Sequence, residues 1–154
     1  STSAGPLTLS TSFDGVNWSP ADTVPAGSTN FNKVLTFPRE GTFAVSFKFR
    51  NGYGAESPIY TRYYLVDHTP PEFEVKTANG ATATTGSTVQ LAISARDNVS
   101  PILYYSINGR AYPALPPDGV VASPTLAPGY NTLRIKVIDQ AGNVATRTLS
   151  VWKL

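Results

Sequence analysis

Apolar and polar side chains alternate with a period of two along several segments of this 154-residue chain. In residues 42–50 every second side chain is apolar, and residues 88–94 and 132–137 repeat that arrangement. Alternation of this kind is typical of a strand that buries one face and exposes the other to solvent. Helical periodicity is almost absent, and Gly, Pro, Asn and Asp separate the alternating segments. The pattern predicts an all-β protein of the β-sandwich type.

Two halves of the sequence resemble each other. Residues 12–15 (Ser-Phe-Asp-Gly) match residues 106–109 (Ser-Ile-Asn-Gly), and residues 51–54 (Asn-Gly-Tyr-Gly) match residues 139–142 (Asp-Gln-Ala-Gly). Both pairs read as turns in which Asp or Asn bonds the local backbone and Gly takes a positive φ. A Pro-Pro pair at 70–71 predicts a stiff connector between the halves. We therefore predict two tandem units, residues 1–67 and 72–154, with a joint at residues 68–71.

Two short motifs point to a known class of repeat. Residues 137–143 (Val-Ile-Asp-Gln-Ala-Gly-Asn) are close to a recurrent V-x-D-x-A-G-N hairpin, and residues 66–71 are close to a D-x-T-P-P joint. With these motifs the chain resembles the bacterial immunoglobulin-like (Big-type) repeat domains of secreted and cell-surface proteins. The resemblance covers essentially the whole second unit and is weaker in the first. It implies two immunoglobulin-like β-sandwiches and an extracellular setting, and it implies no activity.

The first unit is shorter than the second at its beginning. Residues 71–100 precede the Ser-Ile-Asn-Gly strand of the second unit, whereas only residues 1–6 precede the matching strand of the first. The first unit is therefore expected to lack its opening strands and to leave a hydrophobic groove beside open sheet edges, which are costly to leave bare. Three explanations stay open: a fragment cut inside a domain, a smaller sandwich of another topology, or completion by a strand from a neighbouring subunit, which would give a filament.

If subunits exchange strands, the N-terminal stretch is the segment that is most free to reach a neighbour. The predicted donor and assembly residues are Ser1, Thr2, Ser3, Ala4, Gly5, Pro6, Leu7, Thr8 and Leu9.

Composition and charge remove several classes of function. Twelve Lys and Arg against ten Asp and Glu leave a net charge of +2, scattered along the chain, so we expect no nucleic-acid partner. No apolar run approaches the roughly 18 residues of a membrane span. The absence of cysteine excludes disulfides and thiolate metal sites. A Thr- and Ser-rich chain of low charge that begins without methionine favours an extracellular or cell-surface location after removal of a leader.

Catalytic chemistry is not expected. His68, the single histidine, lies in the joint beside Asp67, a poor place for the rigid geometry of a Ser-His-Asp triad. The sequence has no phosphate-binding loop, zinc-ligand spacing or EF-hand. We predict a protein that is not an enzyme and needs no cofactor, with calcium as the one exception.

The calcium hypothesis rests on oxygen donors near the joint. In an immunoglobulin-like sandwich, the entering chain and two of the loops lie at the same end, so their carboxylates and amides are expected to converge on a hard cation. The alternative is that these residues merely cap their turns. The predicted donors are Asp67, Glu72, Asp97, Asp139 and Asn143.

Aromatic residues suggest a second kind of contact. Exposed rings stack on saccharides or on neighbouring subunits, although tyrosine and tryptophan also stabilise sheets by pairing across strands. Neighbouring residues of a strand face opposite sides, so one ring of each Tyr-Tyr pair is expected to point outward. The candidates for glycan or subunit contact are Trp18, Tyr53, Tyr64, Tyr104 and Trp152.

These observations predict a non-catalytic, extracellular structural protein: a rod segment, or a subunit of a pilus-like filament assembled by strand complementation. Its partners would be copies of itself or neighbouring domains of the same surface protein. The rival hypothesis is a spacer or carbohydrate-binding module of a larger secreted enzyme or adhesin, with polysaccharide as the partner.

Overall fold

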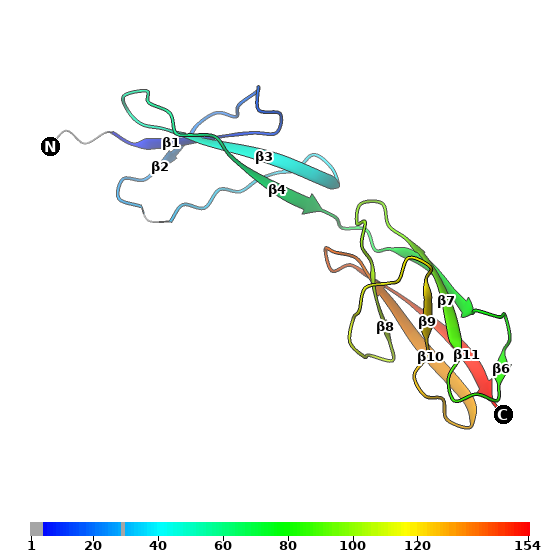
Figure 1. Ribbon diagram of the computed structural model, residues 1–154. Helices are drawn as coiled ribbons and strands as arrows, with labels where there is room; N and C mark the ends of the chain where they lie inside the picture. Colours follow the sequence, from blue (N-terminus) through cyan, green and yellow to red (C-terminus); the bar gives the residue numbers. More distant parts are fainter. Residues whose placement is uncertain (1–4, 29) are drawn as a thin grey trace. The chain divides into compact units, whose positions relative to one another are not determined.

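The computed structural model describes residues 5–28 and 30–154, and every regular element in this part of the chain is a β-strand (Figure 1). The all-β class predicted from the alternation is therefore confirmed. The chain divides into two compact units, unit 1 up to Val66 and unit 2 from Asp67 onward. Over the residues described, no helix is long and apolar enough to span a membrane.

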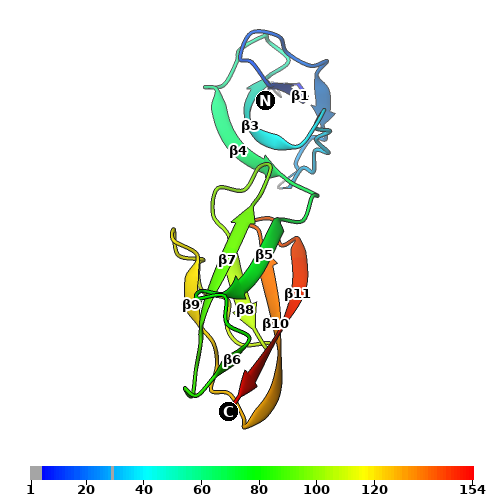
Figure 2. The same cartoon turned by 90° about the vertical axis from the view of Figure 1, so that its right-hand side faces the viewer.

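Unit 2 is a sandwich of two sheets (Figure 2). One sheet has the order β5-β7-β9, with β5 at Glu72–Thr77, β7 at Gln90–Arg96 and β9 at Val120–Ala122. The other has the order β6-β11-β10-β8, with β6 at Ala83–Thr84, β11 at Val144–Lys153, β10 at Gly129–Ile138 and β8 at Tyr104–Ile107. The two alternating segments of the second half thus lie in different sheets, and their apolar faces meet.

The core of unit 2 follows from that alternation. Leu91 and Ile93 project from β7, and Ile135 and Val137 project from β10, all of them fully or almost fully buried. Burying one such side chain stabilises a fold by about 1.5–3 kcal/mol. The complete buried cluster is Phe73, Leu91, Ile93, Ile107, Val121, Leu126, Leu133, Ile135, Val137 and Val151.

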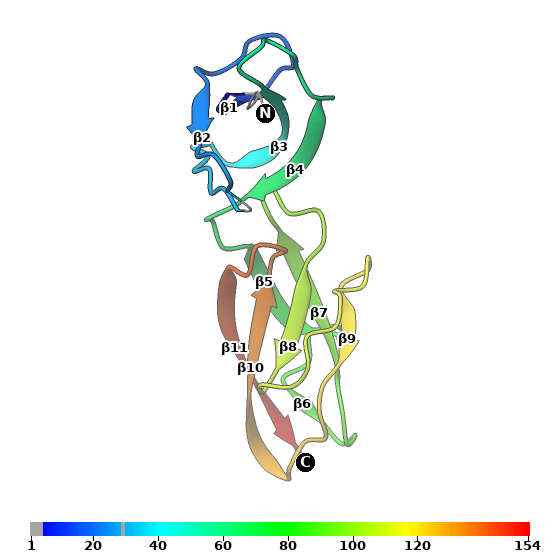
Figure 3. The same ribbon diagram turned by 90° about the vertical axis from the view of Figure 1, so that its left-hand side faces the viewer.

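Unit 1 has one sheet among its described residues, with the order β2-β1-β3-β4 (Figure 3). The strands are β1 (Leu7–Ser12), β2 (Asp22–Val24), β3 (Gly41–Arg50) and β4 (Tyr60–Val66). Its buried hydrophobic side chains in the part described are three, Leu9, Val24 and Val45. The phenylalanines of β3 alternate as predicted but are half-buried rather than buried. Unit 1 therefore has a much thinner core than unit 2.

The internal repeat is visible in the hydrogen bonds of the matching turns. The Asn51 N–H donates to the Ala55 carbonyl at 3.0 Å, and the Asp139 N–H donates to the Asn143 carbonyl at 3.1 Å. These turns join β3 to β4 and β10 to β11, so the single sheet of unit 1 corresponds to the β8-containing sheet of unit 2. No counterpart of the β5-β7 pair is present in the described residues of unit 1.

The N-terminal donor prediction needs correction. Leu7, Thr8 and Leu9 lie in β1, where they pair with β2 on one side and, from Thr8 onward, with β3 on the other. Leu9 is only 4% exposed, so moving this stretch to a neighbour would open its own sheet. Gly5 and Pro6 are exposed and precede the strand. The remaining predicted donors, residues 1–4, lie outside the described residues.

Candidate functional site

Three aspartates converge at one end of unit 2. Asp67 opens the unit, Asp97 directly follows β7 and Asp139 directly follows β10. One carboxylate oxygen of each lies within 4.8 Å of those of the other two. Asp67 is 6% exposed and Asp139 is 2% exposed, so the cluster is largely removed from water. The structure thus brings together three of the five predicted cation donors.

One oxygen of each carboxylate caps a turn. The Asp97 Oδ1 accepts the N–H groups of Val99 and Ser100 at 2.9 and 2.7 Å. The Asp139 Oδ1 accepts two backbone N–H groups at 2.9 Å in the same way, and the Asp67 Oδ1 accepts one at 3.1 Å. The alternative reading of these residues as turn caps is therefore correct for one oxygen of each, and it leaves the second oxygens to be explained.

The second oxygens differ in how they are satisfied. The Asp67 Oδ2 accepts the Ser100 hydroxyl, and the Asp139 Oδ2 accepts the Asn143 amide, each at 2.8 Å. The Asp97 Oδ2 is buried and has no hydrogen-bond partner in the part of the chain that the structure describes. A buried carboxylate oxygen without a donor is unfavourable, because it loses water and gains nothing in exchange. Turn capping does not account for this atom.

The charges in the cluster repel one another. Burial raises the pKa of Asp67 above its ordinary value of 3.8, and the charges of Asp139 and Asp97 raise it further. Hydrogen bonds from Ser100 and Thr69 act in the opposite direction. None of the ion pairs formed by residues 5–28 and 30–154 includes any of the three aspartates. The negative charges of Asp139 and Asp97 therefore oppose the ionisation of Asp67.

The donor set suits a hard cation. Calcium takes six to eight oxygen ligands at about 2.3–2.6 Å, so two of its ligands lie at most about 5.2 Å apart. The 4.8 Å limit for the three aspartate oxygens meets this condition. These three carboxylates would be the protein's charged ligands, with carbonyl or water oxygens completing the shell.

The other two predicted donors have different places. Asn143 lies beside the cluster, where its Nδ2 donates to Asp139 and, at 3.0 Å, to the Asp67 carbonyl; it positions the cluster. Glu72 is not part of the cluster, and we withdraw it. Its carboxylate accepts two N–H groups of Arg96 at 2.6 and 2.9 Å on the exposed surface, because the two residues pair directly across β5 and β7.

The five predicted aromatic contacts are divided between the two units and differ in exposure. In unit 1 Trp18 is half-buried under the Lys48 ammonium, 4.3 Å from its ring, and Tyr53 is exposed at a turn. Tyr64 packs on Phe37, with ring centroids 5.6 Å apart.

The outward ring of the first Tyr-Tyr pair is therefore Tyr63, 76% exposed, and not Tyr64. In unit 2 Tyr104 is half-buried, and the exposed Trp152 pairs across β10 and β11 with Tyr130, a neighbour that the sequence prediction missed. Tyr130 lies near the start of β10, on the same face as the polar residues Thr132 and Arg134. Its place in this alternation would have predicted an outward-facing ring.

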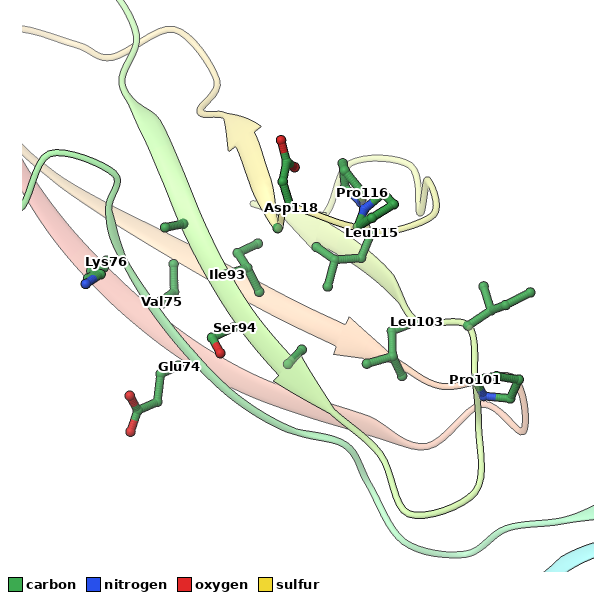
Figure 4. Close-up of a pocket in the computed structure, with 15 residues that line it drawn as sticks. Glu74, Val75, Lys76, Ile93, Ser94, Pro101, Leu103, Leu115, Pro116 and Asp118 are labelled. Carbon is green, nitrogen blue, oxygen red and sulfur yellow. The ribbon is translucent and has the colours of Figure 1, made fainter.

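A cavity of about 840 Å³ in unit 2 offers no catalytic grouping (Figure 4). Its lining is mostly apolar and includes three prolines, and it contains no histidine. The carboxylates of Glu74 and Asp118 project from different sides of it (Figure 4). Paired carboxylates that face a common substrate, as glycoside hydrolysis requires, are therefore not formed here.

Unit 1 carries an apolar groove of about 580 Å³ on the inner face of its sheet. Leu7 and Tyr60 at its rim are 44% and 54% exposed, which is unusual for the core-facing side of a strand. Lys33 lies in the groove and forms an ion pair with Asp22. The complete lining is Leu7, Leu9, Val24, Ser28, Asn30, Phe31, Lys33, Phe47, Phe49, Tyr60, Arg62 and Tyr64.

Comparison with known proteins supports the fold. No protein-family model matches the chain, and no curated protein matches its sequence. Among solved structures it is similar to the fibronectin(III)-like modules of CbhA from Clostridium thermocellum, with a TM-score of 0.55 and 12% sequence identity. The match covers 99% of this chain and 80% of that one. Fibronectin(III)-like modules share the immunoglobulin-like sandwich architecture, so the chain has an immunoglobulin-like β-sandwich fold.

Proposed function

We propose that this chain is a non-catalytic structural segment of an extracellular surface protein, and that strands from outside residues 5–154 complete unit 1. The observation that carries the proposal is the open groove on the inner face of the β2-β1-β3-β4 sheet, where Leu7 and Tyr60 remain 44% and 54% exposed. An apolar face and an open groove are poorly tolerated in water, so a segment of polypeptide is expected to cover them.

Three further observations support a structural role. The described cavities hold no grouping of nucleophile, base and orienting acid. The similarity to fibronectin(III)-like modules fits a spacer or structural module of a larger protein. The low charge, with Thr- and Ser-rich strands and no cysteine, fits an extracellular rod.

The source of the completing strands separates two forms of this function. Strands from the same protein would give a rod segment, whereas strands from a neighbouring subunit would give a pilus-like filament. Light scattering after gel filtration and negative-stain microscopy of the 154-residue chain distinguish the two. Fibres that grow with concentration would establish the filament, and a strict monomer at all concentrations would refute it. A monomer that also lacks any exposed apolar face by dye binding would refute strand complementation altogether.

We also propose that the aspartate cluster binds calcium and fixes the start of unit 2. The buried, unpartnered Asp97 Oδ2 is the specific observation in favour. A cation held by Asp67 would tie the first residue of the unit to the loops after β7 and β10. Calorimetric melts with calcium and with chelator test this, and identical unit 2 midpoints would refute it.

Polysaccharide binding is the rival function. The exposed pair of Tyr130 and Trp152, with ring centroids 5.5 Å apart, is the feature that favours it. Retention of a monomeric chain on insoluble polysaccharide would support this rival over the structural proposal.

A further inference from the structure

The corresponding sheets of the two units differ in how much of their inner face is covered. In unit 2 the inner face of the β8-containing sheet is covered by the β5-β7-β9 sheet, and Ile135 at its centre is fully buried. In unit 1 Val45 at the centre of β3 is also fully buried, but Phe47 and Phe49 line an open groove. In unit 2 the matching residues Ile135 and Val137 are buried in one cluster with Phe73 of β5 and with Leu91 and Ile93 of β7.

A second feature of unit 1 points to the kind of segment that is missing. Residues 31–37 alternate strictly between half-buried and exposed side chains, with Phe31 and Leu35 inward and Val34 86% exposed. This is the pattern of a strand, yet the segment belongs to no sheet in the described structure. The corresponding segment of unit 2, which also precedes the long central strand, is β9, and β9 pairs with β7. Residues 31–37 are therefore an extended segment without the strand that would pair with it.

We propose that the groove of unit 1 is the docking site of an antiparallel β-hairpin of the β5-β7 kind, carried by the same polypeptide and running into β1. Its second strand pairs with residues 31–37, and alternate apolar side chains of both strands fill the groove over Leu7, Phe47 and Tyr60. The inference rests on the proposed completion of unit 1 by added strands and names the element that completes it. It replaces the donated N-terminal strand, since Leu7–Leu9 are already paired.

The internal repeat favours a hairpin in the same polypeptide. In unit 2 the hairpin leads into β8 through residues 97–103, and β1 occupies the place of β8 in unit 1. A hairpin joined to its sheet by a short linker also has a high effective concentration, so it outcompetes a strand from another molecule.

The test is a capped chain in which a copy of residues 71–100 replaces residues 1–6 and joins directly to Leu7. The matched control carries the same added segment with its copies of Phe73, Leu91 and Ile93 changed to Ser. Both are compared with the unmodified chain by amide hydrogen exchange of residues 31–37 and by binding of an apolar-surface dye. A Trp152→Phe background leaves Trp18 as the fluorescent reporter of unit 1 unfolding.

The capped chain is expected to exchange the amides of residues 31–37 at least about tenfold more slowly and to lose most dye binding, because new ladder hydrogen bonds form and the groove closes. The Ser control is expected to match the unmodified chain. Equal behaviour of the capped chain and its control would overturn the inference. Equal protection by the same hairpin added as a separate, equimolar peptide would overturn the same-polypeptide source in favour of a second molecule.

Failure of this inference and failure of the proposed function give different results. If the unmodified chain polymerises and the cap changes neither exchange nor polymers, completion proceeds by another segment and the hairpin is wrong. If the cap protects residues 31–37 and the unmodified chain is monomeric, the hairpin stands and the filament form of the function fails.

Discussion

Replacing Asp97 by asparagine tests the electrostatics of the aspartate cluster most directly. The Asp97 Oδ1 accepts two backbone N–H groups, and an asparagine carbonyl accepts them in the same geometry, although more weakly than a carboxylate. The change therefore keeps the turn and replaces the buried, unpartnered Oδ2 by an N–H₂ group within the cluster. The substitution removes one charge and supplies the missing donor without changing the shape of the site.

The expected magnitude follows from the geometry. Two full charges 4.8 Å apart repel by about 3.5 kcal/mol at an effective dielectric constant of about 20. Hydrogen bonds from Ser100 and Thr69 favour ionised Asp67 and offset part of this repulsion. We therefore expect Asp97→Asn to raise the unfolding free energy of unit 2 by about 1–3 kcal/mol in chelator at neutral pH. Calcium at about a hundred times its Kd would stabilise the wild type by about 2.7 kcal/mol, and the variant much less.

Urea unfolding in a Trp18→Phe background measures this, because Trp152 then reports unit 2 alone. Asp118→Asn is the matched control: its Oδ1 caps a turn by accepting the Val120 N–H at 3.0 Å, on the exposed surface and outside the cluster. We expect the control to change stability by no more than about 0.5 kcal/mol under either condition. The reasoning is refuted if Asp97→Asn is no more stable than wild type in chelator. The cation site is refuted if calcium stabilises both proteins equally.

Three further predictions follow from single residues. The pKa of Asp67 in the folded protein lies above its ordinary value of 3.8. Without divalent ions, unit 2 should therefore lose stability as the pH rises above 3.8 and the buried carboxyl ionises. A stability profile that is flat from acid to neutral pH would contradict this. Gly119→Ala should lower the unfolding free energy of unit 2 by about 3 kcal/mol or more, because the new Cβ would lie 2.1 Å from the Ile93 carbonyl oxygen. Gly109→Ala, at a residue with φ +76° and open space around it, should lower it by about 1 kcal/mol. Equal shifts in melting temperature would argue against the close approach at Gly119. Trp152→Ala should leave any retention on insoluble polysaccharide unchanged, and a pull-down abolished by this change would favour the carbohydrate-binding rival.

The sequence predicts what depends on alternation and on turn chemistry. Residues 42–50 and 132–137 lie in strands because a period of two admits no other regular element. The ends of β7 and β10 determine where Asp97 and Asp139 lie, so the approach of these residues to Asp67 follows from the topology of a sandwich. The sequence does not predict side-chain contacts that depend on which residue lies opposite on the neighbouring strand. Glu72 faces Arg96 rather than the cluster because of the β5-β7 register, and Tyr64 rather than Tyr63 points inward because of the β3-β4 register.

The prediction that residues 1–9 are a donated strand also depended on strand pairing that the sequence does not reveal. The internal repeat supplies part of the missing information. The alternation in β1 is short, so the sequence does not distinguish a strand of its own sheet from a strand given to a neighbour. Pairing settles the matter, since β1 lies between β2 and β3 and buries Leu9. With β1 fixed at the place of β8, unit 2 becomes an internal reference for unit 1. Differences in exposure at matching positions then show where the inner face of unit 1 is uncovered, because the strand order β1-β3-β4 matches β8-β10-β11 and the turn after the central strand is shared. By that comparison the described residues of unit 1 hold no counterpart of the two strands that precede β8, and these are the strands that the proposed completion has to supply.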